Sequence, residues 1–173
     1  MRHVCMDIVC APTTCMLRGQ VRLSFEITTP DIDECVLPAL FERLRHTDAT
    51  VLGTCAGAIL LCDPQDGGQP LIPATIDRNA YGRQVDSFQS IIDAPLLSRS
   101  FPGVFIRAPR FESLSVGAKV AANNGDEPVG VISGRRLALT FHPELTEDFG
   151  FHIWLLNTAM GPIESFSSVE SEA

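Results

Sequence analysis

The sequence predicts a single α/β domain, a sheet flanked by helices, and three observations predict it. The chain has 173 residues, of which 45% are hydrophobic, so it is long enough to bury one sizeable core. Residues 49–62 have the pattern of a short apolar strand, a tight turn and a helix, the unit from which α/β sheets are built. Further short β-type runs follow before a closing helix, and no long linker or internal repeat divides the chain.

Local patterns predict the elements in order. Residues 1–20 show no clear period and are treated as a separate N-terminal segment, and residues 21–27 alternate as a strand does. A helix is expected to start at Thr29 and Pro30, with a kink or break at Pro38. The main domain is expected to span 21–161. Its later elements are β-type runs at 70–76, 103–109, 128–134 and 135–141 and an amphipathic helix at 149–160. An acidic tail at 162–173 is expected to be disordered.

The charge and the cysteines limit the function classes and the compartment. A net charge of −8 does not favour nucleic acid or an anionic membrane as a partner, and no apolar run approaches the length of a membrane span. The first twenty residues lack the repeated arginines of a targeting sequence. The six cysteines form no C-x-x-C pair or common zinc spacing, so free thiols in a reducing cytoplasm are expected, without a metal.

The stretch VLGTCAGAIL, 51–60, places Cys55 on the turn between a strand and a helix. Small neighbours allow a strained backbone and close approach of a substrate. The following helix directs its positive N-terminal end at the sulfur, which favours a thiolate, and its amides can hold an oxyanion. Cys55 is therefore a candidate nucleophile. The alternative is a small buried cysteine in a β–α turn, which is an equally common setting for a free thiol.

A second motif, LALTFHPE at 137–144, supplies the groups that a cysteine nucleophile needs. His142 and Glu144 stand two residues apart beyond the end of an apolar strand, and Pro143 stiffens the link between them. Active sites of open α/β sheets lie at such carboxyl ends. His142 is the expected base and Glu144 the group that orients it, against the alternative of a structural histidine in a loop.

Two further motifs carry arginines. RNAYGRQVDSF, 78–88, begins with Arg78, and VFIRAP, 104–109, places Arg107 in an otherwise apolar strand. A charge there is costly unless it is paired or faces a site. Two guanidinium groups near a thiolate suit a carboxylate substrate, although ordinary salt bridges are the alternative for each arginine.

Four blocks in this order, GTCAG, RNxYGRQVDSF, GVFIRAP and TFHPELTED, resemble the glutaminase subunit of pyridoxal 5′-phosphate synthase, a class I, triad-type glutamine amidotransferase. The resemblance covers about residues 51–150 closely. It implies a flavodoxin-like three-layer sandwich with a mostly parallel sheet. It also implies hydrolysis of L-glutamine to glutamate and ammonia, without a cofactor, for a synthase subunit that makes vitamin B6. The implied roles are catalysis by Cys55, His142 and Glu144 and glutamine binding by Arg78, Ile106 and Arg107.

The N-terminal part departs from the family pattern. Members begin with a strand and a G-x-x-x-LQG segment, and a later PGGEST loop binds glutamine and supplies an oxyanion amide. The nearest match here is LSFEITT, in which Phe25 and Ile27 replace a glycine and a serine, whereas Glu26 matches the acid of the loop. The first βαβ portion is therefore expected to be shortened or divergent. Loss of one oxyanion donor costs roughly 3 to 4 kcal/mol in transition-state stabilisation.

Three hypotheses follow. The first is a glutaminase that supplies ammonia for vitamin B6 synthesis. The second is a catalytically impaired subunit that keeps the synthase interface without a complete oxyanion loop. The third, a peptidase or redox protein on the same fold, is disfavoured because neither chemistry calls for the paired arginines.

Overall fold

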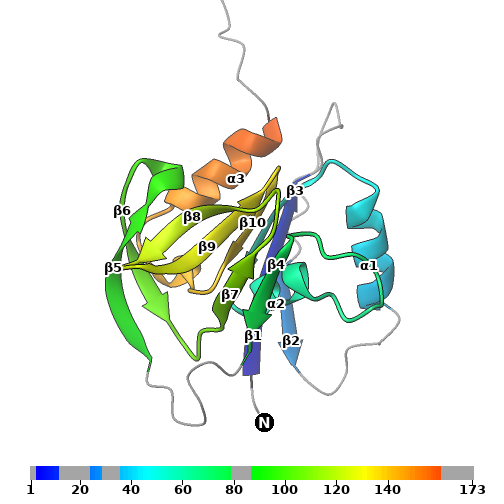
Figure 1. Ribbon diagram of the computed structural model, residues 1–173, viewed down its shortest axis with the longest axis horizontal. Helices are drawn as coiled ribbons and strands as arrows, with labels where there is room; N and C mark the ends of the chain where they lie inside the picture. The colour runs from blue at the N-terminus through cyan, green and yellow to red at the C-terminus, as the bar shows by residue number, and fades with distance from the viewer. Residues whose placement is uncertain (1–2, 12–23, 29–35, 79–86, 161–173) are drawn as a thin grey trace, which may run out of the picture.

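The computed structural model describes residues 3–11, 24–28, 36–78 and 87–160 (Figure 1). Within these ranges, strands outnumber helices, and two single-turn 3-10 helices join them. The elements are β1 (His3–Ala11), β2 (Ser24–Thr28), α1 (Val36–Arg45), β3 (Thr50–Thr54), α2 (Ala56–Cys62), β4 (Ala74–Asp77), β5 (Phe88–Ala94), η1 (Pro95–Leu97), β6 (Arg99–Phe105), β7 (Arg110–Leu114), β8 (Lys119–Asn124), β9 (Glu127–Ser133), β10 (Arg136–Leu139), η2 (Pro143–Leu145) and α3 (Gly150–Met160).

Eight of the strands form one mixed sheet in the order β2-β1-β3-β10-β9-β8-β5-β6, and β4 pairs with β7 in a separate two-stranded sheet. The expectation of a mostly parallel sheet is wrong for the described strands, because only β3 and β10 pair in parallel. The reason is connectivity: short connections join β5 to β6, β8 to β9 and β9 to β10, and each of these pairs is antiparallel.

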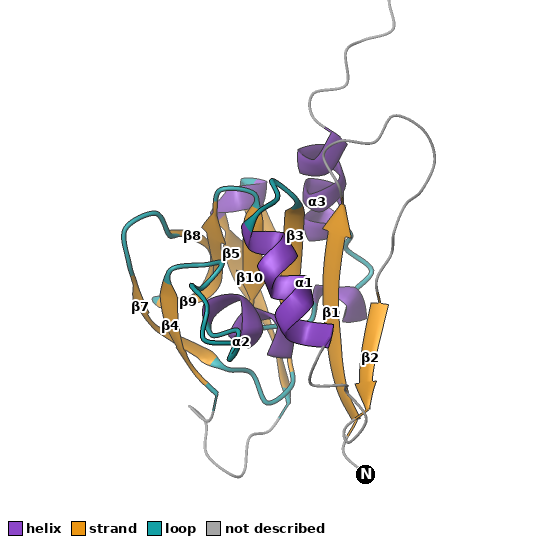
Figure 2. Cartoon of the chain, turned by 90° about the vertical axis from the view of Figure 1, so that its right-hand side faces the viewer, coloured by secondary structure: helices purple, strands orange, loops and turns teal. Residues whose placement is uncertain are grey.

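The expected three-layer arrangement is present, with a hydrophobic cluster on each face of the sheet. Side chains of α1, α2 and the β4–β7 pair form one cluster, and α3 packs on the other. In β10, Ala138 belongs to the first cluster, whereas Leu137 and Leu139 belong to the second, as the two-residue period of a strand requires. Figure 2 shows α1 and α2 together in front of the sheet.

The helices differ from expectation in two respects. The described part of α1, Val36–Arg45, contains Pro38, so the expected break at this proline does not interrupt the helix. Helix α3 is not amphipathic, because apolar side chains occupy its exposed positions as well as its buried ones. No helix of the described residues is long and apolar enough to cross a membrane.

The N-terminal part contains two antiparallel strands where the family pattern has a βαβ unit, in agreement with the expected divergence. Strand β1 pairs antiparallel with both β2 and β3. The sequence did not predict β1, since His3–Ala11 shows no clear period. The expected start of the helix at Thr29 and Pro30, residues 12–20 of the N-terminal segment and the tail at 162–173 all lie outside the described residues.

Candidate active site

The one parallel strand pair among the described residues brings Cys55 and His142 to the same edge of the sheet. Thr54 of β3 is in register with Leu139 of β10, and each candidate residue follows its strand within three positions. The backbone N–H of Cys55 donates to the carbonyl oxygen of Leu139 at 2.8 Å, so the turn that carries the thiol is fixed directly to β10. Carboxyl ends of adjacent parallel strands are the usual location of a site in such sheets.

The backbone at Cys55 is strained, as the elbow motif predicts. Its φ is 47° and its ψ is −104°, a conformation that residues with a side chain rarely adopt. Gly53 permits the tight turn, because a Cβ at this position would lie 2.8 Å from the carbonyl carbon and oxygen of Gly57 in α2. The amides of Ala56 and Gly57 belong to the first turn of α2, where they have no intrahelical acceptor.

His142 and Glu144 form a close pair beside the strand end. Nδ1 of His142 lies 2.6 Å from Oε1 of Glu144, and His142 is 6% exposed. Pro143 starts the 3-10 helix η2, which turns the chain so that both side chains meet. The N–H of His142 donates to the carbonyl oxygen of Val104 in β6 at 2.8 Å. The residue is therefore held through its backbone and through Nδ1, with Nε2 left for a reacting group.

The surroundings of His142 favour its charged form. Burial opposes the charge and is the largest single influence. Hydrogen bonds and charge interactions with Cys55 and Glu144 together outweigh it and raise the pKa of His142 to about 10. A pKa so far above the ordinary value means that the imidazole carries a proton at neutral pH. A protonated histidine beside a thiol and a carboxylate can donate to a leaving group.

Ile106 and Arg107 follow β6, and the backbone of Ile106 comes close to the thiol. Sγ of Cys55 donates to the carbonyl oxygen of Ile106 at 3.8 Å. Arg107 was expected within a strand, but β6 ends at Phe105. Its φ is 46°, so the backbone turns sharply there, and the guanidinium is exposed instead of buried in an apolar strand. Cys55, which carries the sulfur, and Arg107, on the loop that faces it, therefore both have a strained backbone.

Arg78 lies at the other end of α2 from Cys55. One of its guanidinium nitrogens is 3.6 Å from a carboxylate oxygen of Asp63, the residue after the helix, and the two side chains are 41% and 60% exposed. Helix α2, whose seven residues span about 10 Å, lies between Asp63 and Cys55. The rest of the predicted motif, 79–86, lies outside the described residues. Glutamine binding by Arg78 stays a prediction.

The segment aligned with the glutamine-binding loop contributes an edge strand. Residues Ser24–Thr28 form β2, which β1 separates from β3 in the sheet order. The role expected of a PGGEST loop, an amide next to the thiol, therefore has no counterpart in this strand. Residues 29–35, which follow it, lie outside the described residues.

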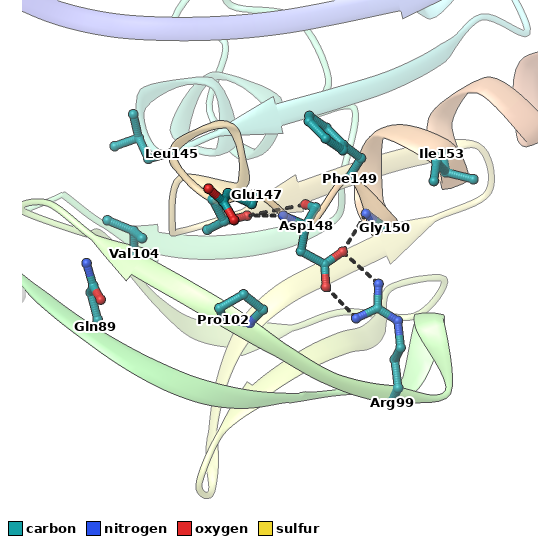
Figure 3. Close-up of a pocket in the computed structure, with 11 residues that line it drawn as sticks. Gln89, Arg99, Pro102, Val104, Leu145, Glu147, Asp148, Phe149, Gly150 and Ile153 are labelled. Atoms are coloured by element: carbon teal, nitrogen blue, oxygen red, sulfur yellow. Dashed lines mark hydrogen bonds and ion pairs between the residues drawn. The ribbon is translucent and has the colours of Figure 1, made fainter.

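A pocket of about 660 Å³ lies next to the candidate site without including its side chains (Figure 3). Val104, whose carbonyl holds His142, lines the pocket, and so do Leu145 to Gly150, which follow Glu144. One loop thus carries His142 and Glu144 and forms a wall of the pocket. Among the described residues, no group of three or more histidine, cysteine, aspartate or glutamate side chains could hold a metal ion.

The structure adds a support for this loop that the sequence did not predict. Arg99 donates to Asp148 through two nitrogens, at 2.5 and 2.7 Å, and Asp148 accepts the N–H of Gly150 at 2.8 Å. Asp148 therefore links β6 to the start of α3. An aspartate two residues before a helix is a recognisable start signal, whereas nothing in the sequence identifies Arg99 as its partner.

Comparison with known proteins agrees with this geometry. The model of the SNO glutamine amidotransferase family matches residues 31–160. The chain is 44% identical over 131 residues to the pyridoxal 5′-phosphate synthase subunit PdxT of Thermococcus onnurineus, covering 70% of this chain and 66% of that one. The protein of the same name from Staphylococcus haemolyticus is 39% identical over 111 residues, covering 62% and 60%. The chain thus spans about 60 to 66% of the length of these relatives.

Two solved structures share the fold of this chain. A crystal structure of a glutamine amidotransferase is 42% identical, with a TM-score of 0.63, covering 72% of this chain and 68% of that one. A putative GMP synthase protein from Thermoplasma acidophilum, at 14% identity and a TM-score of 0.52, covers 71% of this chain and 64% of its own and shares the fold. By the family match over residues 31–160, the chain belongs to the SNO glutamine amidotransferase family.

Proposed function

We propose that the protein is a glutaminase, which hydrolyses L-glutamine to L-glutamate and ammonia through Cys55, His142 and Glu144. The observation that carries the proposal is the juxtaposition at the β3–β10 edge. There a strained, partly exposed cysteine lies beside a histidine whose pKa is raised to about 10 by Cys55 and Glu144, against the effect of burial. Nucleophile, base and orienting carboxylate are the three groups that acyl transfer by a cysteine enzyme requires.

In the first half of the reaction, the Cys55 thiolate attacks the side-chain carbonyl carbon of glutamine and a tetrahedral oxyanion forms. The N–H groups of Ala56 and Gly57, which have no intrahelical acceptor, are the donors nearest in sequence to the sulfur. Collapse of the intermediate breaks the carbon–nitrogen bond. His142 gives its proton to the departing nitrogen, so ammonia leaves and a thioester on Cys55 remains.

In the second half, water clears the thioester. His142, now neutral, removes a proton from the water as it attacks the thioester carbonyl, and the carbon–sulfur bond breaks to release glutamate. Glu144, at 2.6 Å from Nδ1, keeps the imidazole in one orientation through both halves and stabilises its charge.

For the substrate, we propose that Arg107 and Arg78 pair with the carboxylate of glutamine and that the backbone at Ile106 contacts its amide. The carbonyl of Ile106 lies 3.8 Å from the Cys55 sulfur, within reach of an amide bound there. Arg107 is exposed on the same loop, where its guanidinium can pair bidentately with a carboxylate.

The partner in this proposal is a pyridoxal 5′-phosphate synthase subunit, which would consume the ammonia in a cytoplasmic complex. Two relatives at 44% and 39% identity carry the name of a subunit of that synthase. Ammonia is small and diffuses away rapidly, so a glutaminase of this kind gains from release inside a complex.

The test is ammonia release from L-glutamine by the full chain, with and without a cognate synthase subunit, beside Cys55→Ala and Cys62→Ala. Cys62 is a matched control, since it is the last residue of the same helix and its side chain is buried. Turnover that requires Cys55, persists in Cys62→Ala and rises with the partner is the expected result. No turnover with the synthase bound would indicate an impaired binding subunit, and turnover independent of Cys55 would overturn the proposed mechanism.

A further inference from the structure

The peptide unit between Ile106 and Arg107 turns its carbonyl oxygen toward the Cys55 thiol. Sγ of Cys55 donates to this oxygen at 3.8 Å, a long and weak hydrogen bond. A carbonyl oxygen can only accept a hydrogen bond, so it can hold the neutral thiol but repels a thiolate or an oxyanion. In this orientation, which is called carbonyl-in below, the peptide suits the resting protein and opposes the charge that forms during the reaction.

The backbone of Arg107 is strained in the carbonyl-in orientation. Its φ is 46°, a value that L-residues other than asparagine and aspartate rarely adopt. Rotation of the rigid peptide plane by half a turn exchanges the positions of the Ile106 carbonyl and the Arg107 N–H. It also moves φ of Arg107 to about −130°, in the extended region that any residue adopts. The same motion therefore relieves the strain and turns an N–H toward the sulfur, an orientation called N–H-in below.

The residues on both sides of this peptide are fixed, whereas the peptide itself is not. Phe105 is the last residue of β6 that pairs with β5, and it is 2% exposed. Ala108 is 3% exposed, in the hydrophobic cluster that includes α3. Within the described part of the chain, the carbonyl of Ile106 and the N–H of Arg107 have no backbone hydrogen-bond partner. The peptide can therefore rotate without moving β6 or the core.

The peptide lies where a second oxyanion donor would act. Oxyanions of acyl transfer are usually held by two donors, and the amides that follow Cys55 at the start of α2 supply one side. The segment aligned with the donor loop of the family forms β2, which β1 separates from β3. The peptide 106–107, in contrast, follows β6 and lies next to the sulfur. A donor at this position completes a pair with α2.

We propose that the Arg107 N–H is this second donor, and that the peptide 106–107 alternates between the two orientations during catalysis. The proposal rests on the glutaminase function proposed above. In the carbonyl-in orientation, the Ile106 oxygen accepts a hydrogen bond from the amide nitrogen of an entering glutamine. In the N–H-in orientation, the Arg107 N–H donates to the oxyanion that forms when the Cys55 thiolate attacks, and again when water attacks the thioester. The N–H only donates a hydrogen bond, so no proton leaves it.

The first experiment compares Arg107→Val, Arg107→Asn and Arg107→Gly by ammonia release at saturating glutamine, in the presence of a cognate synthase subunit. All three variants lose the guanidinium, so a higher KM is common to them and kcat reports on the peptide. Valine avoids a positive φ, whereas asparagine tolerates it and glycine adopts it freely. We expect kcat to fall from valine to asparagine to glycine, by roughly 5- to 30-fold in all, the range that the cost of a positive φ implies.

Stability is expected to change in the opposite direction, because the carbonyl-in orientation is the resting one. Arg107→Asn should unfold at a higher urea concentration than Arg107→Val. Ser98 is the matched control, since its φ is 55° and it lies exposed between η1 and β6. Ser98→Asn and Ser98→Val are expected to show the same order of stability with equal kcat. A purely structural role of Arg107 would instead move kcat and stability together.

The second experiment replaces the Arg107 N–H by an ester oxygen, through lactic acid incorporated at position 107 in cell-free translation, with Arg107→Ala as its reference. The ester is expected to lower kcat about 100-fold below Arg107→Ala, the effect of one lost oxyanion donor. Equal kcat in these two proteins, or a kcat that does not fall from Arg107→Val to Arg107→Gly, would overturn the proposal, while turnover that requires Cys55 leaves the glutaminase function intact. Absence of such turnover in the wild-type chain would overturn both.

Discussion

Nδ1 of His142 lies 2.6 Å from Oε1 of Glu144, while the second carboxylate oxygen, Oε2, is buried and has no hydrogen-bond partner among the described residues. The carboxylate of Glu144 therefore makes its one described hydrogen bond to the imidazole. A buried charged oxygen without a partner is costly, and such groups persist where the chemistry needs them. The pair is a dedicated unit, and it can be tested separately from the nucleophile.

Glu144→Gln is expected to lower kcat by about 100-fold or more, within the range that general acid–base catalysis contributes, with a smaller effect on KM. The amide keeps the shape of the side chain but loses the charge that stabilises the protonated imidazole. Steady-state ammonia release, with the glutamine concentration varied, checks this. Glu147→Gln is the control, because Glu147 is exposed on the same loop three residues later. Equal losses in both variants would contradict a specific role for Glu144.

The pKa of His142 predicts how stability depends on pH. Its ordinary value is 6.5 and its value in the folded protein is about 10. The folded state therefore binds the proton more tightly than the unfolded state does. The resulting stabilisation is complete below pH 6.5 and is lost as the pH rises through about 10.

Urea unfolding at several pH values between 6.5 and 10 is expected to show a free energy of unfolding that falls with pH in wild type and falls less in His142→Asn. The comparison of the two slopes removes the contribution of other groups that titrate in this range. Cys55→Ser deletes one of the two partners that raise the pKa of His142, so its slope is expected to lie between them. A steeper fall in His142→Asn than in wild type would show that the direction of the shift is wrong.

The sequence predicted those parts of the site that depend on local pattern. The end of β3, the start of α2 and the His142–Glu144 pair all follow from short stretches in which turn residues and apolar runs alternate. A strained backbone at Cys55 was likewise expected from its small neighbours, and its φ is positive. Such features are fixed by residues within a few positions of one another, so they can be predicted from a single sequence.

What depends on pairing between distant segments was not predicted. The pairing of the strand at His3–Ala11 with β3 and the carbonyl of Val104 that holds His142 depend on segments far apart in sequence. A contact made by a backbone carbonyl, such as that of Val104, also cannot be recognised from the type of the residue. Arg107 was misplaced within a strand because its turn depends on a positive φ, which usually signals glycine or asparagine and not arginine.

The two cysteines of the β3–α2 unit are expected to differ in reactivity. Burial raises the pKa of the Cys62 thiol to about 12, with a further rise from the charge of Asp63, so this thiol stays protonated near neutral pH. Cys55 is partly exposed and lies beside an imidazole. Iodoacetamide is therefore expected to modify Cys55 at least about 10-fold faster, since the thiolate is the reactive form.

Both cysteines lie in one tryptic peptide, residues 46–78, so fragment ions must locate the modification. Labelling in denaturant is the control, because both thiols should then react at similar rates. Glutamine in excess is expected to slow modification of Cys55 alone. Faster labelling of Cys62 in the folded protein would contradict the burial on which this prediction depends.

The carboxylate of Asp148 is expected to contribute to the stability of the fold through more than its ion pair. Arg99–Asp148 and Arg110–Glu127 have nearly equal exposure, 46% and 24% against 45% and 25% for the arginine and the acid. Ion pairs with so much solvent contact contribute little by themselves. Asp148, however, also accepts the N–H of Gly150 at the start of α3. The loss of this hydrogen bond in Asp148→Ala is therefore expected to cost about 1 kcal/mol, the usual contribution of a helix-capping group.

The same comparison separates stability from positioning. Asp148 lies on the loop that carries His142 and Glu144, whereas Glu127 lies on β9. If the ion pair holds this loop in place, Asp148→Ala lowers kcat at a temperature where both variants remain folded, and Asp148→Asn, which keeps an oxygen for the Gly150 amide, recovers most of the stability but less of the activity. Thermal unfolding by calorimetry gives the first quantity and ammonia release the second. Equal activity in Asp148→Ala and Glu127→Ala would limit Asp148 to capping α3.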